Sequence, residues 1–144
     1  MTKFFFSIVL FTLFGVNTFA ADSPVIKPVL HSFQNSFSSA KEVAWTVSKD
    51  IYKAEFTFTN QRVTAYFDAS GYLLGLSKNI LSTQLPVLLQ NSLKENQEGF
   101  WIADLVEFSS DEGTSYYATL ENADSKVIIK SNVNSWTVDK KIKK

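Results

Sequence analysis

Residues 51–76 carry the clearest structural pattern in the chain, and they read IYKAEFTFTNQRVTAYFDASGYLLGL. Apolar and polar side chains alternate through residues 51–59, which is typical of a β-strand with one buried face. The face expected to be buried carries Tyr52, Ala54, Phe56 and Phe58. The next two apolar runs continue this pattern, so the stretch predicts three consecutive antiparallel strands that share one apolar face.

Two turns separate these strands. A two-residue turn at Asn60-Gln61 would bring apolar residues opposite one another, whereas a slip of one residue would place apolar side chains opposite polar ones. The sequence Asp68-Ala69-Ser70-Gly71 suits a type I turn, with Asp first and Gly last. The cross-strand neighbours predicted in this way are Phe58 with Val63, Phe56 with Ala65, Ala54 with Phe67, and then Tyr72, Leu74 and Leu76 with Phe67, Ala65 and Val63.

Residues 1–20 have the features of a secretory signal peptide. Lys3 precedes an apolar run at positions 4–16, which is too short to span a bilayer comfortably. Thr18 and Ala20 provide the small residues that favour cleavage before Ala21. An uncleaved anchor helix is the alternative, and an intact-mass measurement distinguishes the two. We therefore expect a mature periplasmic or secreted domain at residues 21–144, with no stable membrane insertion after cleavage.

Charge and cysteine content exclude several classes of protein. Without residues 1–20 the chain has 13 basic and 14 acidic residues, a formal charge of −1, so it lacks the basic character of a nucleic-acid-binding protein. The lysines in residues 140–144 are expected to form a solvated end, with contact to a membrane surface as the alternative. The chain has no cysteine, which excludes disulfides, thiol nucleophiles and cysteine-bound metals.

Helices are expected before and after the three strands. Residues 28–40 begin with a proline suited to a first helical turn and continue with apolar residues at helical spacing, and residues 43–47 alternate as a strand. Residues 82–93 predict a second helix, which Asn96-Gln97-Glu98-Gly99 ends. Strands are then expected at residues 100–108, 115–121, 126–131 and 136–139. The apolar stripes of the two helices are Leu30, Phe33, Phe37 and Ala40, and Leu85, Leu88, Leu89 and Leu93.

The two halves of the chain repeat one pattern. A shift of 64 residues places the residue pattern of the strand at 52–56 on that at 116–120, and a shift nearer 58 aligns the two helices. We therefore expect an α+β fold in which two tandem helix-plus-four-strand units, at about residues 24–80 and 81–144, form one curved antiparallel sheet with both helices on one side.

A family resemblance rests on five motifs in these two halves. The chain resembles the PepSY-like, or beta-lactamase-inhibitor-like, family of small secreted bacterial envelope proteins, and the likeness covers nearly the whole mature chain. It implies the same tandem fold but little about function, because most members have no assigned activity. Asn134-Ser135 stands where the family usually has Asp-Gly or Asn-Gly. The motifs are Leu30-x-x-Phe33-x-x-x-Phe37-x-x-Ala40-x-x-Val43-x-Trp45, Tyr52-x-Ala54-x-Phe56, Ala65-Tyr66-Phe67-Asp68-x-x-Gly71-Tyr72-Leu73, Leu85-Pro86 before the second helix, and Ser115-Tyr116-Tyr117-Ala118-Thr119-Leu120.

The sequence provides no pattern typical of a catalytic or cofactor site. His31 is the single histidine and falls on the polar side of its helix, and no Gly-x-Ser-x-Gly turn is present to hold a nucleophile. Asp104 and Glu107 are expected on opposite faces of their strand, which does not suit a catalytic pair. Phosphate-binding glycine motifs are also absent. We therefore expect neither an enzyme nor a protein that needs a cofactor or a metal.

The face of the sheet away from the helices remains as the candidate site. It is expected to carry Tyr66 and Tyr117, one from each half, with Lys53 and Lys130 beside them, and neither ring should contribute to the core. Tyrosine flanked by lysine suits a protein interface, although tyrosine and threonine also occur on solvated strands. The leading hypothesis is a binding or inhibitor-like protein whose partner is another envelope or secreted protein. A small-ligand carrier with a cleft between helices and sheet is the second hypothesis. The full set expected on this face is Lys53, Glu55, Thr57, Thr64, Tyr66, Leu73, Tyr117, Thr119, Ile128, Lys130 and Thr137.

Overall fold

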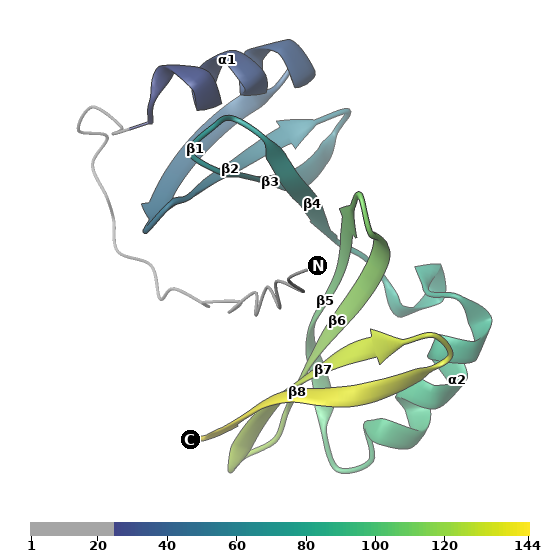
Figure 1. Ribbon diagram of the computed structural model, residues 1–144. Helices are drawn as coiled ribbons and strands as arrows, with labels where there is room; N and C mark the ends of the chain where they lie inside the picture. Colours follow the sequence, from purple (N-terminus) through teal and green to yellow (C-terminus); the bar gives the residue numbers. More distant parts are fainter. Residues whose placement is uncertain (1–24) are drawn as a thin grey trace, which may run out of the picture.

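The chain forms one eight-stranded antiparallel sheet with two α-helices, an α+β fold (Figure 1). The computed structural model describes residues 25–144, so the expected signal peptide and its cleavage site lie outside the described residues. The strands follow the chain in the order β1 to β8, and each pairs with its neighbours in sequence. The sheet bends between its two halves, so that β1–β4 and β5–β8 run in different directions.

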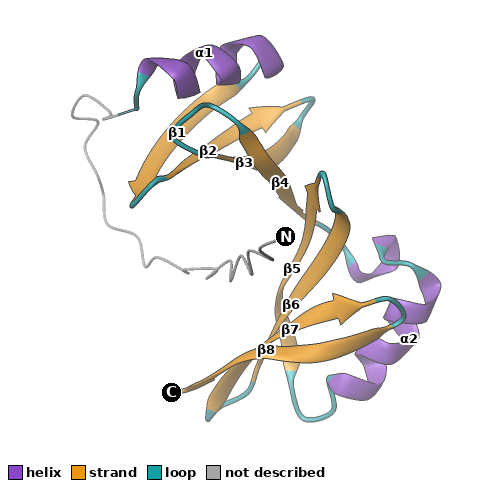
Figure 2. Ribbon diagram, viewed as in Figure 1, coloured by secondary structure: helices purple, strands orange, loops and turns teal. Residues whose placement is uncertain are grey.

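Each half of the sheet has its own helix. In the first half α1 lies over β1–β4, and in the second half α2 lies over β5–β8 (Figure 2). Pro28 lies in the first turn of α1, where a backbone N–H would have no hydrogen-bond acceptor within the helix. The missing N–H of proline therefore costs the helix no hydrogen bond. The elements are α1 (Lys27–Ser36), β1 (Lys41–Ser48), β2 (Ile51–Phe58), β3 (Gln61–Phe67), β4 (Leu73–Asn79), the 3₁₀ turn η1 (Ser82–Gln84), α2 (Val87–Asn96), β5 (Trp101–Ser110), β6 (Gly113–Glu121), β7 (Ser125–Asn132) and β8 (Ser135–Lys143).

Both helices pack on the same face of the sheet, which follows from the register where the halves meet. Leu76 of β4 packs against the core under α1, and its same-face neighbour Lys78 pairs with Glu107 of β5. Because side chains alternate along a strand, Leu105 lies on the same face as Glu107, and it belongs to the core under α2. The opposite face is therefore free of helices, and it forms the inner side of the bend in Figure 1.

The core under α1 is aromatic. Phe56 of β2 is fully buried, with ring centroids 5.0 Å from Phe33 and 4.9 Å from Phe37. The predicted position of Phe56 at the centre of the buried face is thus confirmed. Trp45 adds an edge-on contact with Phe33 at 5.1 Å. Such edge-to-face pairs contribute about 0.5–1.5 kcal/mol beyond the area they bury.

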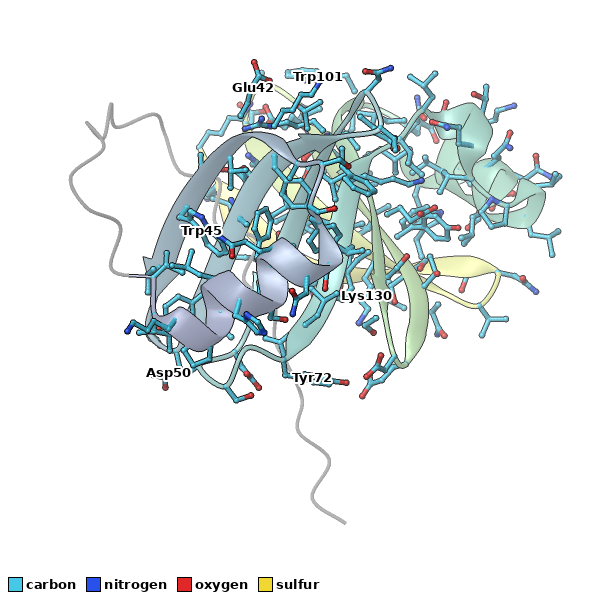
Figure 3. All side chains as sticks on the ribbon, turned by 90° about the horizontal axis from the view of Figure 1, so that it is seen from above. Glu42, Trp45, Asp50, Tyr72, Trp101 and Lys130 are labelled. Atoms are coloured by element: carbon cyan, nitrogen blue, oxygen red, sulfur yellow. The ribbon has the colours of Figure 1, made fainter. Side chains whose placement is uncertain are left out.

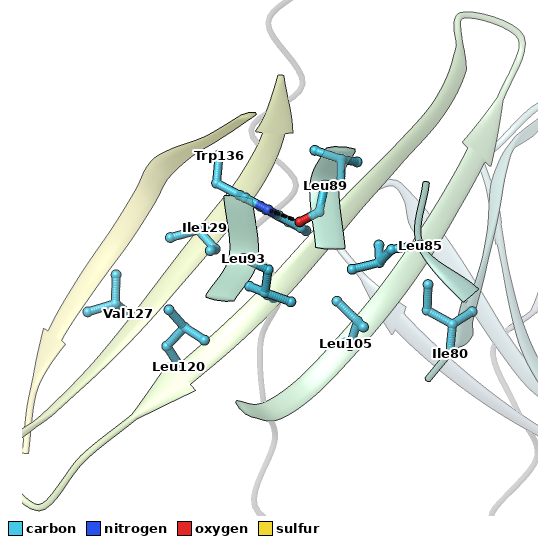
Figure 4. Close-up of a cluster of buried hydrophobic side chains, with 10 residues drawn as sticks. Ile80, Leu85, Leu89, Leu93, Leu105, Leu120, Val127, Ile129 and Trp136 are labelled. Atoms are coloured by element: carbon cyan, nitrogen blue, oxygen red, sulfur yellow. Dashed lines mark hydrogen bonds between the residues drawn. The ribbon is translucent and has the colours of Figure 1, made fainter. Parts of the chain in front are cut away.

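The core under α2 is mainly aliphatic and has one polar link (Figure 4). Leu85, Leu89 and Leu93 pack against the strands, and the indole Nε1 of Trp136 donates a hydrogen bond to the carbonyl oxygen of Leu89 at 3.1 Å. This bond joins α2 to β8, so the buried indole has a partner for its N–H.

The register predicted for the first hairpin is wrong. Phe56 lies opposite Val63, and Ala54 lies opposite Ala65, because the turn falls at Thr59-Asn60 and not at Asn60-Gln61. Thr59 and Asn60 have φ of 48° and 61°, as a type I′ turn requires. The same apolar face is still buried, since both strands keep their inward-facing residues.

The predicted side-chain directions in β4 are also wrong at its start. A bulge places Phe67 opposite Leu73 and Tyr66 opposite Gly75, which leaves Leu74 as the extra residue. Leu73 therefore packs against the core under α1 and does not belong to the helix-free face. Tyr72, expected in the core, is 52% exposed.

Two smaller expectations, both about the helices, need correction. The helix α1 buries Val29 with Phe33 in place of Leu30, and Leu88 of α2 is 55% exposed. The C-terminal lysines are exposed, as expected, although residues 140–143 belong to β8, which pairs with β7 as far as Lys143 opposite Ser125.

Candidate functional site

The helix-free face carries a continuous set of polar and aromatic side chains across the sheet. Its residues are identified by register: Lys53 pairs with Tyr66, Ser77 with Phe108, and Tyr117 with Lys130. Asp104 and Glu107 lie on opposite faces, as predicted. The residues of this face along β2–β8 include Lys53, Glu55, Thr64, Tyr66, Gly75, Ser77, Val106, Phe108, Tyr117, Thr119, Ile128, Lys130, Thr137 and Lys140.

Tyr66 belongs to an aromatic pair that bridges the two halves of the sheet. Its ring centroid lies 5.9 Å from that of Phe108 in an edge-on arrangement, and its hydroxyl lies 3.4 Å from Ser77 Oγ. Phe108 reaches this position because Gly75 has no side chain: a Cβ at Gly75 would lie 2.4 Å from Phe108 Cζ. The pair therefore depends on a glycine in the middle of β4.

Tyr117 and Lys130 form a second pair, on β6 and β7. The Lys130 ammonium lies 5.5 Å from the centroid of the Tyr117 ring, within the range of a cation–π interaction. Tyr117 also pairs with Val106 of β5, which is 7% exposed although no helix covers it. Side chains on the inner side of a bent sheet converge, which is consistent with this burial.

The four residues singled out in the sequence thus form two pairs on one face. Lys53 lies opposite Tyr66, and Tyr117 lies opposite Lys130, while β4 and β5 separate the two pairs. Lys53 also forms an ion pair with Glu55 at 3.3 Å. Neither tyrosine belongs to the two core clusters.

Phe108, Val106 and Gly75 were not singled out in the sequence. The strand at residues 100–108 reads as apolar on both sides, which indicates that some of its apolar residues lie outside the core. To identify Phe108 as a residue of this site, one would have to know that β4 pairs with β5. That pairing brings Phe108 over Gly75.

Charged groups at the far end of this face are mostly paired. Glu121 lies 3.4 Å from Lys126 Nζ and 3.2 Å from Lys144 Nζ. The hydrogen bond from Lys144 is the main reason that the pKa of the Glu121 carboxyl is below its usual value. Trp101, next to this group, is 53% exposed, and Lys144 Nζ lies 5.2 Å from its ring centroid.

On the helix side of the sheet, the pKa of Tyr116 is raised, chiefly by burial and then by the nearby Glu107 carboxylate.

His31 is exposed, with Nε2 3.1 Å from the Asn35 amide. Within residues 25–144, no three histidine, aspartate or glutamate side chains are close enough together to hold a metal ion. Neither α1 nor α2 is long and apolar enough to cross a membrane.

Two surface hollows can be described. One, of about 320 Å³, lies where β4 and β5 separate and is lined by residues 79–82 and 102–105. The other, of about 220 Å³, is lined by Ser39, Lys41, Thr57, Thr59 and Asn60. Neither is lined by a residue of α1 or α2, so neither is the cleft between helix and sheet that the carrier hypothesis requires.

Comparison with known proteins finds similarity at the level of structure. No protein-family model and no curated protein matches the sequence. A BLIP-like protein from Bacteroides fragilis superposes with a TM-score of 0.67 at 15% identity, over 84% of this chain and 87% of that one. A DUF2874 family protein from Bacteroides ovatus has a TM-score of 0.72 at 15% identity, over 85% and 89%.

A third similar structure is a protein from Bacteroides eggerthii to which a periplasmic location is ascribed. It has a TM-score of 0.71 at 13% identity, over 88% of this chain and 90% of that one. These identities are too low to transfer an activity, and the comparison does not single out the PepSY-like family. The comparison supports the beta-lactamase-inhibitor-like part of the resemblance found in the sequence. This chain has the fold of BLIP-like and DUF2874 family proteins.

Proposed function

We propose that this chain is a non-enzymatic periplasmic or secreted protein that binds another envelope or secreted protein through the helix-free face of its sheet. The observation that carries the proposal is the aromatic strip on this face, in which Phe108 lies over Gly75 beside Tyr66 and Tyr117 lies beneath Lys130. Aromatic side chains that present a fixed, half-buried surface supply contact area at low entropic cost.

The position of the strip favours a macromolecular partner. It extends from β3 to β7 along the inner side of the bend, whereas small-molecule sites are enclosed cavities. A loop or helix from a partner protein would fit against such a concave sheet. The likeness to a protein with an ascribed periplasmic location supports the same compartment as the signal peptide expected at residues 1–20.

The element order supports a repeated architecture as part of this proposal. Helix α1 with β1–β4 precedes α2 with β5–β8, in the order expected for two tandem units at about residues 24–80 and 81–144. Each unit would then contribute one tyrosine–lysine pair to the binding face.

Capture from the native envelope with matched variants tests the proposal. The double variant Tyr66→Ala/Tyr117→Ala removes both anchors, and we expect it to lose about 2 kcal/mol or more in affinity for a partner that the wild type captures. The control Val87→Ala/Leu88→Ala truncates two exposed side chains of α2 and should retain the partner. Circular dichroism establishes that both variants are folded at the assay temperature. Equal capture by the two folded double variants would contradict the proposal.

A further inference from the structure

The part of the helix-free face formed by β6–β8 has a closely packed floor bordered by lysines. Ile128 is 4% exposed and its cross-strand neighbour Thr119 is also 4% exposed. Lys126 and Lys130 lie two residues before and after Ile128 on the same face of β7, and Lys140 lies directly opposite it on β8. Three lysine residues therefore flank one buried apolar position.

Two of these lysines have no carboxylate partner among residues 25–144. Lys126 is paired with Glu121, but of the ion pairs among residues 25–144 none includes Lys130 or Lys140. Two carboxylates nearby already have partners: Glu121 is shared between Lys126 and Lys144, and Asp104 accepts a hydrogen bond from the Asn79 amide. Asp139, at the bulge before Lys140, forms no ion pair with any of residues 25–144.

We propose that this part of the face binds an acidic segment of a polypeptide, with an aromatic or aliphatic side chain against the Tyr117 ring and its carboxylates beside Lys130 and Lys140. The proposal rests on the function proposed above and names the chemistry of the partner. Charge complementarity favours this occupant, because a carboxylate would neutralise Lys130 while an apolar side chain contacts the ring of Tyr117.

The same charges argue against a second copy of this chain. A symmetric dimer through β6–β8 would bring Lys130 and Lys140 of the two copies toward each other, which like charges disfavour. Nucleic acid is disfavoured by the overall balance of 14 basic and 14 acidic residues.

Titration with defined polymers tests the inference on the isotope-labelled secreted protein. The probes are a glutamate–tyrosine copolymer and, for comparison, a lysine–tyrosine copolymer and a single-stranded oligonucleotide. We expect the glutamate–tyrosine copolymer to shift the amide resonances of β6–β8 and the other two probes to leave them unchanged. Equal binding of the oligonucleotide would overturn the inference by showing a general anion site.

The pleat of β8 supplies a matched control. Lys130→Gln/Lys140→Gln removes two charges from the helix-free face, whereas Lys141→Gln/Lys143→Gln removes two from the opposite face, since Lys141 pairs with Val127 of the core. We expect the first variant to weaken copolymer binding by about tenfold and the second by less than about twofold. Equal losses in the two variants would overturn the inference, because they would reflect net charge alone.

The two proposals fail in different ways. If Lys130→Gln/Lys140→Gln leaves copolymer binding intact while Tyr66→Ala/Tyr117→Ala abolishes native capture, the acidic-segment inference falls and the binding face stands. If the lysine pair controls copolymer binding but the tyrosine pair does not affect native capture, the inference survives and the aromatic strip is not the main binding surface.

Discussion

At the scale of single residues, neighbouring positions on one strand have opposite environments. Phe56 is fully buried among the rings of Phe33 and Phe37, whereas Thr57 faces away and its hydroxyl donates a hydrogen bond to Glu42 at the surface. The stability of the fold should therefore depend strongly on one residue and weakly on the next.

Substitution of these neighbours provides the first prediction. Phe56→Ala should lower the free energy of unfolding by about 3–5 kcal/mol, because it opens a cavity in an aromatic core. Thr57→Ala should lower it by well under about 1 kcal/mol. Denaturant unfolding of the two variants measures both values, and similar losses would contradict the assignment of faces.

Gly75 provides a second prediction at this scale. Gly75→Ala should destabilise the protein by about 1–3 kcal/mol, because the new methyl group would overlap the Phe108 ring and would lie 2.9 Å from the Ser109 carbonyl oxygen. In a Phe108→Leu background the same substitution should cost less, since the ring is gone. A double-mutant cycle from urea unfolding checks this, and full additivity would show that the ring does not contact Gly75.

At the scale of elements, α2 is joined to the sheet edge by a single polar contact within an apolar core. The bond from Trp136 to the Leu89 carbonyl fixes the helix against β8, the last strand of the sheet. Without it, the helix would be held by leucine packing alone.

Trp136→Phe should therefore lower the free energy of unfolding by about 1–3 kcal/mol, since it removes both the donor and part of the buried ring. Trp101→Phe is the matched control, because Trp101 is 53% exposed, and it should cost less than about 0.5 kcal/mol. Thermal unfolding of both variants tests this. A larger loss for Trp101→Phe would mean that the exposed indole has a structural role.

The sequence predicted the elements better than their exact pairing. Alternation of side chains depends on local burial, so it located the strands and their apolar faces. The first hairpin was misplaced because Thr59 adopts a positive φ, which is unusual for a β-branched residue. The bulge at Leu74 reverses the faces on which the side chains before it lie. Nothing in the local sequence distinguishes this bulge from a regular strand. Within the candidate site, Tyr66 could be identified by alternation, but its contact with Phe108 required the long-range pairing of β4 with β5.

At the scale of the whole molecule, the two cores share no residue. The halves are joined by the register pairs of β4 and β5, from Leu76–Ser109 to Asn79–Val106, and by a hydrogen bond from the Tyr72 hydroxyl to Asp111. Tyr72 lies at the end of the molecule away from Glu42 and Trp101 (Figure 3). Each core should therefore respond separately to mutation.

Hydrogen exchange on core variants tests this separation. Phe56→Ala should reduce the protection of amides in β2 and β3 while those of β6 and β7 keep most of theirs, and Leu93→Ala should give the reverse pattern. A uniform loss of protection in either variant would show that the whole chain unfolds as one cooperative unit.

The strand order has a consequence for the way the chain reaches this structure. Since every strand pairs with the strands next to it in sequence, each pairing closes a short loop, except that between β4 and β5, which encloses η1 and α2. Short closures cost little chain entropy, so an all-neighbour sheet should fold faster than sandwiches whose partners are distant in sequence. The joining of β4 to β5 would then come last, and the concave face would be completed in the final step of folding.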